Sequence, residues 1–212
     1  MADRQTVIVS STGRDLPEHR AMVRDACLAT GYFPDMMESL RAEDVDAVTK
    51  SLEMVDRADV YVCVLGRSYG TVPKGQPKGK ERSITEMEFE RALERKIPIL
   101  VFLMDELHPL TISMVETSKL AQRRLQKFKD RASAGRLRGR FASPEQLKTQ
   151  VMAALDNLTL QRMHAAAQAP STLLQASSAG DAQLWLRLHD LSNQLSQLQS
   201  RLGVPPERQP PA

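Results

Sequence analysis

The chain has 212 residues, enough for one full domain and a further segment, and 42% of them are hydrophobic, which predicts a globular core rather than disorder. The net charge of +3 is mild, no apolar run approaches the ~20 residues needed to cross a bilayer, and residues 1–5 do not resemble a signal peptide. Cys27 falls in a predicted helix and Cys63 in a predicted strand, which is typical of buried free thiols in a reducing compartment. We therefore expect a cytoplasmic protein with no disulfide framework and no membrane contact.

Strands and helices alternate in the first part of the chain. Residues 5–10 form a β-branched run that predicts the first strand. Hydrophobic residues at helical spacing predict helices over residues 14–30 and 44–57, and Gly31 ends the first of them. Between the two helices, residues 32–37 predict a weak second strand.

The stretch of residues 58–104 contains the clearest pattern. Two apolar runs, Val60–Leu65 and Ile97–Met104, predict strands buried on both faces, because the runs are continuous rather than alternating. Between them lie a basic, glycine-rich loop and a helix that starts near Ser83, with Glu86 completing a capping box. Parallel strands joined by a helix predict an α/β domain.

Three further elements complete the expected domain. A long polar helix is predicted over residues 117–131, and an edge strand over residues 137–141. A final helix begins at Pro144, after an N-cap at Ser143, and continues to about His164. Five β–α repeats predict an α/β fold with a doubly wound, mostly parallel five-stranded sheet of the flavodoxin kind, and that class leads us to expect the strand order 2-1-3-4-5.

The composition changes after the α/β domain of residues 1–164. Residues 165–180 are mainly Ala, Ser, Gln, Gly and Pro, which predicts a flexible linker, and the proline-rich residues 204–212 predict a disordered tail. Between them, residues 181–203 predict an amphipathic helix whose leucines occupy heptad a and d positions: Leu184, Leu188, Leu191, Leu195, Leu198 and Leu202. This seam favours a homo-oligomer formed through residues 184–202; the alternative is a helix that folds back over its own domain.

Glu88 is the main candidate for chemistry. It shares a helical row with Ile84 and Ala92, on the side of the helix that should face the sheet. A buried carboxylate is costly unless it is paired, and burial raises its pKa. The alternative is a Glu that packs its stem at the edge of this face while its head reaches water or Arg91.

The expected topology also predicts where a ligand binds. In open α/β sheets ligands bind beyond the carboxyl ends of strands, where the strand order reverses, here between the first and third strands. Both strand ends are small, rich in hydroxyls and carry an Arg, which suits a phosphorylated or sugar-bearing ligand held partly by backbone N–H groups. Glu88 should point toward the same crevice. The residues expected to line it are Ser10, Ser11, Thr12, Arg14, Asp15, Gly66 and Tyr69.

Metal and cofactor motifs are not found in the sequence. The four histidines share no metal-ligand spacing with each other or with the cysteines. The loop at residues 75–81 is one residue too short for a phosphate-binding loop, and Glu81 stands where Ser or Thr should hold magnesium. This loop suits a mobile lid or an ordinary surface loop. We therefore expect no metal and no cofactor.

A basic stretch lies between Lys119 and Arg140, with nine Lys or Arg residues and one acid, Asp130. Such a cluster could attract nucleic acid, a membrane surface or a phosphorylated ligand. Only Phe128 is interleaved with it, and no nucleic-acid-binding motif overlaps it. The interpretation we favour is a solvated helix face followed by a short strand, without a nucleic-acid partner.

Several segments, in order, resemble the TIR-like domain of unknown function that often stands at the N-terminus of large NTPase-and-repeat sensor proteins. The resemblance spans residues 5–160 and is carried by residues 7–20, 37–38, 51–70 and 83–92. More distantly, the position of Glu88 on the helix after a strand that ends at Gly66 is similar to TIR domains and nucleoside deoxyribosyltransferases. In both groups a glutamate at the matching helix position is catalytic.

This resemblance implies cleavage or transfer at an N-glycosidic bond, with NAD as the leading substrate rather than a cofactor and Glu88 as the catalytic carboxylate. It further implies activation by oligomerisation, a role in immune or antiviral defence signalling, and a sensor protein as a partner. Two alternatives stay open: a non-catalytic TIR-like signalling adaptor, and a nucleoside deoxyribosyltransferase-like enzyme. The basic loop at residues 74–82 favours a phosphorylated ligand over a plain nucleoside.

Overall fold

The computed structural model describes residues 4–12, 15–36, 45–109, 111, 114–166 and 187. The chain divides into two compact units, Met1–Leu158 and Thr159–Ala212, and the sheet belongs to the first. In chain order the labelled elements are β1 (Thr6–Ser11), α1 (Pro17–Ala29), β2 (Phe33–Asp35), α2 (Val45–Arg57), β3 (Val60–Leu65), α3 (Ile84–Arg95), β4 (Ile99–Met104), α4 (Lys119–Ser133) and β5 (Leu137–Phe141). A further helix follows over residues 144–166.

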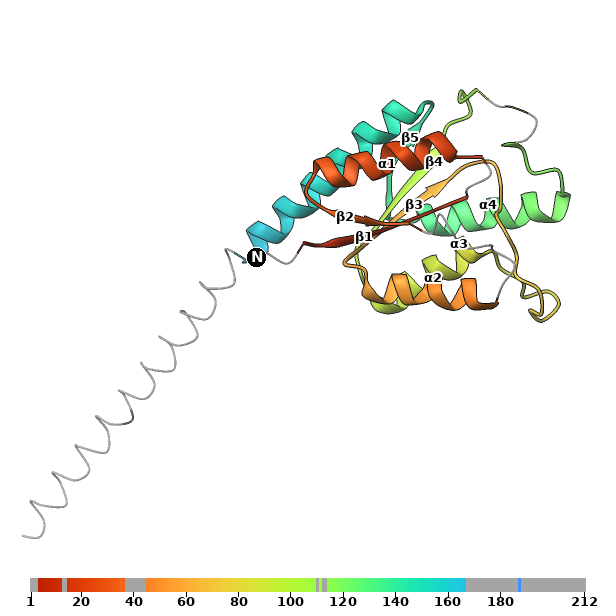
Figure 1. Ribbon diagram of the computed structural model, residues 1–212, viewed down its shortest axis with the longest axis horizontal. Coiled ribbons are helices and arrows are strands. Elements are labelled where there is room, and N and C mark those ends of the chain that lie inside the picture. Colours follow the sequence, from red (N-terminus) through yellow and green to blue (C-terminus); the bar gives the residue numbers. More distant parts are fainter. Residues whose placement is uncertain are drawn as a thin grey trace, which may run out of the picture. The chain divides into compact units, whose positions relative to one another are not determined.

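The five strands form one parallel sheet in the order β2-β1-β3-β4-β5, which confirms the predicted topology (Figure 1). Val7 of β1 pairs with Val60 of β3, and Tyr61 of β3 pairs with Ile99 of β4. Every residue of β3 and β4 is buried, as the continuous apolar runs predicted. The strand order reverses between β1 and β3.

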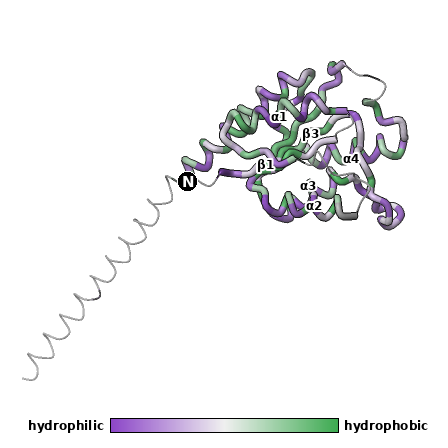
Figure 2. The backbone as a smooth tube through the Cα atoms, viewed as in Figure 1, coloured by the Kyte–Doolittle hydropathy of each residue, from purple (hydrophilic) through white to green (hydrophobic). Residues whose placement is uncertain are grey.

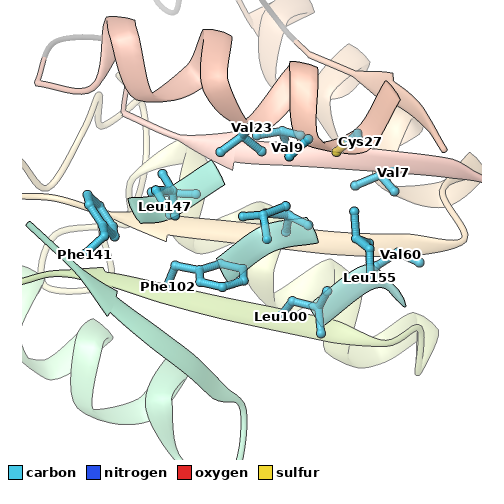
Figure 3. Close-up of a cluster of buried hydrophobic side chains, with 14 of the residues drawn as sticks. Val7, Val9, Val23, Cys27, Val60, Leu100, Phe102, Phe141, Leu147 and Leu155 are labelled. Atoms are coloured by element: carbon cyan, nitrogen blue, oxygen red, sulfur yellow. The ribbon is translucent and has the colours of Figure 1, made fainter. Parts of the chain in front are cut away.

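Alternate residues of β1, β3 and β4 supply two hydrophobic clusters, one on each face of the sheet. On one face, strand residues such as Val9, Val60 and Phe102 pack against α1 and against residues 147–158 of the last helix (Figure 3). On the other face, Tyr61 and Val101 are among those that pack against α2, α3 and α4. The tube view shows the hydrophobic residues concentrated in the strands, with polar residues on the outer helices (Figure 2). Helices on both faces are the doubly wound arrangement.

Local signals set the ends of α3 and α1. The Ser83 side chain accepts a hydrogen bond from the backbone N–H of Glu86, so the predicted cap of α3 is confirmed, and the helix ends at Lys96 in the left-handed conformation. By contrast, α1 begins at Pro17 rather than at residue 14, because proline is favoured at the first helical position. This later start leaves Asp15 in the turn before the helix.

The predicted linker at 165–180, the heptad helix at 181–203 and the tail at 204–212 lie outside the described residues, apart from 165, 166 and 187. These predictions therefore stay predictions. Within the described part of the chain, no helix combines the length and the apolar character that a membrane span requires.

Candidate functional site

Glu88 lies inside the domain at the carboxyl end of β1. Its residue is 7% exposed, and its carboxyl group accepts one hydrogen bond from the Ser10 hydroxyl and another from the Ser51 hydroxyl. Ser10 stands near the end of β1, Ser51 on α2 and Glu88 on α3, so three elements meet at this carboxyl group. The structure places Glu88 as predicted, facing inward beside the turn after β1. Its catalytic role stays a prediction.

Burial is the main influence on the protonation of Glu88 and raises its pKa. The hydrogen bonds from Ser10 and Ser51 and the positive charge of Arg20 act in the opposite direction. Arg20 is itself held on the strand end, because its guanidinium donates to the Ser11 hydroxyl at 2.9 Å. The result is a carboxyl group that is easier to protonate than an ordinary surface glutamate and that has a hydroxyl donor on each oxygen.

Two further polar groups lie close to Glu88 on strand β3. Tyr61 is fully buried and its hydroxyl donates to the carbonyl of Thr85 at 3.2 Å. Burial, followed by the charges of neighbouring groups that include Glu88, raises the pKa of Tyr61 and of Cys63 well above their ordinary values. Both side chains are therefore neutral near pH 7, and Glu88 is the group here that can exchange a proton.

Ser51 is the site residue that the sequence reasoning missed. It is fully buried and belongs to the α2 row of Ala47, Ser51 and Val55, whose other two members are in the hydrophobic core. A lone hydroxyl in an otherwise apolar, sheet-facing row was the available signal, because a buried hydroxyl needs a partner.

Asp15 ties the turn after β1 to the segment after β3. Its Oδ2 accepts hydrogen bonds from the backbone N–H groups of Arg67 at 2.7 Å and Ser68 at 3.0 Å, and its Oδ1 accepts one from the Thr12 hydroxyl. A Cβ on Gly66 would lie 2.2 Å from Asp15 Oδ2, which explains why glycine stands there. Two backbone donors that we expected to hold a ligand thus hold an internal carboxylate.

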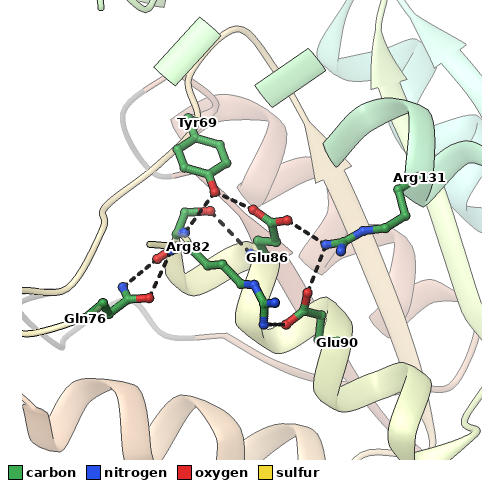
Figure 4. Close-up of polar contacts among 7 residues, drawn as sticks. Tyr69, Gln76, Arg82, Glu86, Glu90 and Arg131 are labelled. Carbon is green, nitrogen blue, oxygen red and sulfur yellow. Dashed lines mark hydrogen bonds and ion pairs between the residues drawn. The ribbon is translucent and has the colours of Figure 1, made fainter. Parts of the chain in front are cut away.

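Tyr69 is directed to the start of α3. Its hydroxyl donates to the Glu86 carboxylate and accepts from the backbone N–H of Ser83 at 3.3 Å (Figure 4). Glu86 in turn forms an ion pair with Arg131 of α4 at 2.6 Å. The structure therefore places Tyr69 in a network with Glu86, while Ser10 belongs with Glu88 and Thr12, Asp15 and Gly66 form a second group.

The loop between β3 and α3 is fastened at its base. Gln76 donates to the carbonyl of Arg82 at 2.8 Å and accepts from the Arg82 N–H at 2.9 Å (Figure 4). Arg82 pairs with Glu90 of α3, and Glu81 pairs with Arg124 of α4 at 2.7 Å. These bonds favour the surface-loop interpretation over a mobile lid.

Of the predicted site residues, Arg14 lies outside the described part of the chain. No group of three or more His, Cys, Asp or Glu residues that could hold a metal ion occurs among the residues with described positions. The ligand-binding roles of Ser10, Ser11, Thr12, Asp15, Gly66 and Tyr69 stay predictions.

Comparison with solved structures returns α/β folds at low similarity. A CMP N-glycosidase from Clostridium botulinum is 13% identical, with a TM-score of 0.36, and the match covers 74% of this chain and 99% of that one. A diflavin flavoprotein from a Nostoc species is 13% identical, with a TM-score of 0.42, covering 77% and 99%. A flavodoxin from Megasphaera elsdenii is 14% identical, with a TM-score of 0.37, covering 72% and 99%. At these scores the three structures carry no argument about activity.

Comparison with curated proteins gives no match. A family model described as a domain of unknown function, DUF4062, matches residues 6–156. This range covers most of the chain and nearly the whole segment, residues 5–160, on which the resemblance to a TIR-like domain of unknown function was recognised. The chain therefore belongs to the DUF4062 family.

Proposed function

We propose that this domain cleaves the N-glycosidic bond of NAD or a related nucleotide, with Glu88 as the catalytic carboxyl group. The observation that carries the proposal is the position of Glu88. Its buried carboxyl group accepts hydrogen bonds from two serine hydroxyls, beside the point where the strand order reverses. The helix that bears Glu88 follows β3, which is the position where the resemblance to TIR domains and nucleoside deoxyribosyltransferases puts a catalytic glutamate.

The two serines support a role in binding ribose. Each donates a hydroxyl hydrogen to one oxygen of Glu88, Ser10 to Oε2 and Ser51 to Oε1. Two neighbouring ribose hydroxyls can offer the same pair of donors. A nucleotide that reaches Glu88 would replace one or both serine bonds, so the carboxyl would lose water contact without losing its hydrogen bonds.

The chemistry is balanced with water as the second substrate. The bond between C1′ and the nicotinamide nitrogen breaks, and its electron pair neutralises the pyridinium charge of the leaving group. The ribosyl centre gains positive charge, which an ionised Glu88 stabilises. Water forms the new bond to C1′, and its proton passes to Glu88 and then to solvent, leaving ADP-ribose and nicotinamide. The raised pKa of Glu88 suits it to accept this proton.

We further propose that copies of the chain associate through residues 184–202 and that association activates the enzyme. The support is the leucine spacing in the sequence, which is typical of a coiled-coil seam. A sensor protein as partner and a role in antiviral defence follow from the family resemblance, and a cytoplasmic location follows from the cysteine pattern; all three belong to the same proposal.

One observation favours a second candidate, a non-catalytic adaptor. Both Glu88 oxygens are already hydrogen-bonded inside the protein, and the residue is only 7% exposed. A carboxyl that only joins α2 and α3 to the sheet would have these bonds too. The two candidates differ in whether Glu88 ever meets a ligand.

The test measures nicotinamide released from NAD by the full-length chain at high protein concentration. Glu88→Gln keeps the shape but removes the charge and leaves one acceptor oxygen where there were two, and we expect it to lower the rate by about a hundredfold or more. Glu94→Gln is the matched control, because Glu94 lies on the same helix and its side chain is 68% exposed. No release by any of the three proteins when assembled would favour the adaptor. Equal, measurable release by all three would contradict the catalytic role of Glu88.

A further inference from the structure

Three cationic side chains meet at the carboxyl edge of β3, β4 and β5, apart from the Glu88 carboxyl. Arg67 follows β3, Lys129 lies on α4, and Arg140 lies near the end of β5. Arg67 and Arg140 are close enough to Lys129 to lower its pKa by their charge. We propose that Arg67, Lys129 and Arg140 form a binding site for a phosphate or diphosphate group.

The topology explains why these residues converge. Arg140 pairs in register with Leu103, and its chain neighbour Phe141 is buried in the cluster on the opposite face, so Arg140 faces the side covered by α4. On α4, Lys129 follows the buried Phe128 and lies one turn after the buried Leu125. Lys129 therefore lies at the sheet-facing border of its helix, not on its outer surface.

Arg67 is fixed in place but is incompletely satisfied. Its guanidinium donates from Nη2 to the carbonyl of Asp105 at 3.2 Å, which anchors it beyond the end of β4. Its Nε is buried and has no hydrogen-bond partner in the described part of the protein. A buried guanidinium N–H without an acceptor is costly, and an oxyanion is the acceptor that a guanidinium fits.

Among the described residues, none of the three cations forms an ion pair with a carboxylate. Asp15 is the acidic group near Lys129, and it already accepts hydrogen bonds from two backbone N–H groups and the Thr12 hydroxyl. Because none of the three cations is held by a carboxylate in the described residues, each can still bind an anion.

The pKa of Lys129 reflects the neighbouring positive charges. Burial, followed by the charges of Arg67 and Arg140, lowers the pKa of Lys129 to about 8, although Asp15 acts in the opposite direction. A bound phosphate would remove the repulsion and restore the pKa toward its ordinary value. Phosphate affinity should therefore fall as the pH rises from 7 to 9.5, because Lys129 loses its proton over that range.

The test uses calorimetric titration of the full-length chain with inorganic pyrophosphate, with ADP and with adenosine. We expect Lys129→Gln and Arg67→Gln each to weaken binding of pyrophosphate and ADP by about tenfold or more. Lys127→Gln, an exposed α4 lysine, is the matched control and should bind as the unchanged protein does. Lys129→Arg should restore binding and keep it at pH 9.5.

Two outcomes would overturn the site: Lys129→Gln binding pyrophosphate as tightly as Lys127→Gln, or no binding of millimolar pyrophosphate by the unchanged protein. Binding of ADP but not adenosine would assign the source of the phosphate to a nucleotide, whereas pyrophosphate binding without ADP binding would assign it to a free diphosphate; either supports the site. The inference does not rest on the proposed glycosidase, since pyrophosphate has no glycosidic bond. Glu88→Gln should leave pyrophosphate binding unchanged.

Discussion

His19 and His108 share a hydrogen bond between their Nε2 atoms, which are 2.9 Å apart, and both rings pack against Phe141. His108 Nδ1 lies 2.7 Å from the carbonyl of Pro109, which can only accept, so this nitrogen carries a hydrogen. In the neutral pair His108 Nε2 then accepts and His19 Nε2 donates. His19 Nδ1 is left as a buried acceptor without a partner among the described residues.

Protonation of His19 would add a hydrogen to its Nδ1, so that this buried nitrogen would become a donor without a partner among the described residues. Burial is the largest cause that lowers the pKa of His19 from 6.5 to about 4; His108 also lowers it, and Glu145 opposes the shift. Because the unfolded chain binds a proton at a higher pH than the folded one, stability is present above pH 6.5 and is lost as the pH falls toward 4. From the two pKa values, the loss between pH 7.5 and pH 5.0 is about 2 kcal/mol.

The assay is reversible urea unfolding at pH 7.5 and pH 5.0, comparing the unchanged chain with His19→Gln. The glutamine amide can donate to His108 but does not titrate, so the variant should lose about 2 kcal/mol less than the unchanged chain on acidification. Other groups titrate in both proteins and cancel in the difference. Glu88 acts with the opposite sign, since its raised pKa favours the folded state at low pH. An equal loss in the two proteins would refute the reasoning.

Two smaller predictions concern the contact between Gly66 and Asp15 and the carboxyl group of Glu88. Gly66→Ala should destabilise the domain by about 3 kcal/mol in urea unfolding, because the new Cβ would displace Asp15 from the N–H groups that it binds. Gly75→Ala should cost only about 1 kcal/mol, from its positive φ, since nothing lies within 4 Å of it; a similar cost for both would contradict this account. Ser51→Ala removes a hydrogen bond that lowers the pKa of Glu88, so the pH dependence of activity should move upward, and an unmoved profile would count against the contact.

Much of the fold could be predicted because its signals are local. The continuous apolar runs at Val60–Leu65 and Ile97–Met104 mark strands buried on both faces, and the structure confirms both, although β4 begins at Ile99. The capping pair Ser83 and Glu86 located the start of α3. The start of α1 was placed too early, because helical spacing alone does not show that Pro17 takes the first helical position.

The site was only partly predictable. Glu88 could be found because a carboxylate interrupted an apolar row. Ser51 could not be paired with it from sequence, since the two residues are 37 positions apart and meet only when α2 packs beside α3. The contacts of His19 with His108 and of Lys129 with Arg67 and Arg140 depend in the same way on elements distant in sequence. The basic stretch of residues 119–140 was interpreted as a solvated face, and most of its Lys and Arg residues are exposed, whereas Lys129 lies half-buried at the sheet-facing border of α4.

The central claim, that the Glu88 carboxyl meets a ligand, can be tested by following the ¹³C signal of this carboxyl through a pH titration. The account predicts a signal that is absent in Glu88→Gln, titrates above the range of ordinary glutamates, and shifts when NAD or ADP-ribose is added. A signal that titrates as a surface glutamate does, or one that is unchanged by saturating nucleotide, would contradict it.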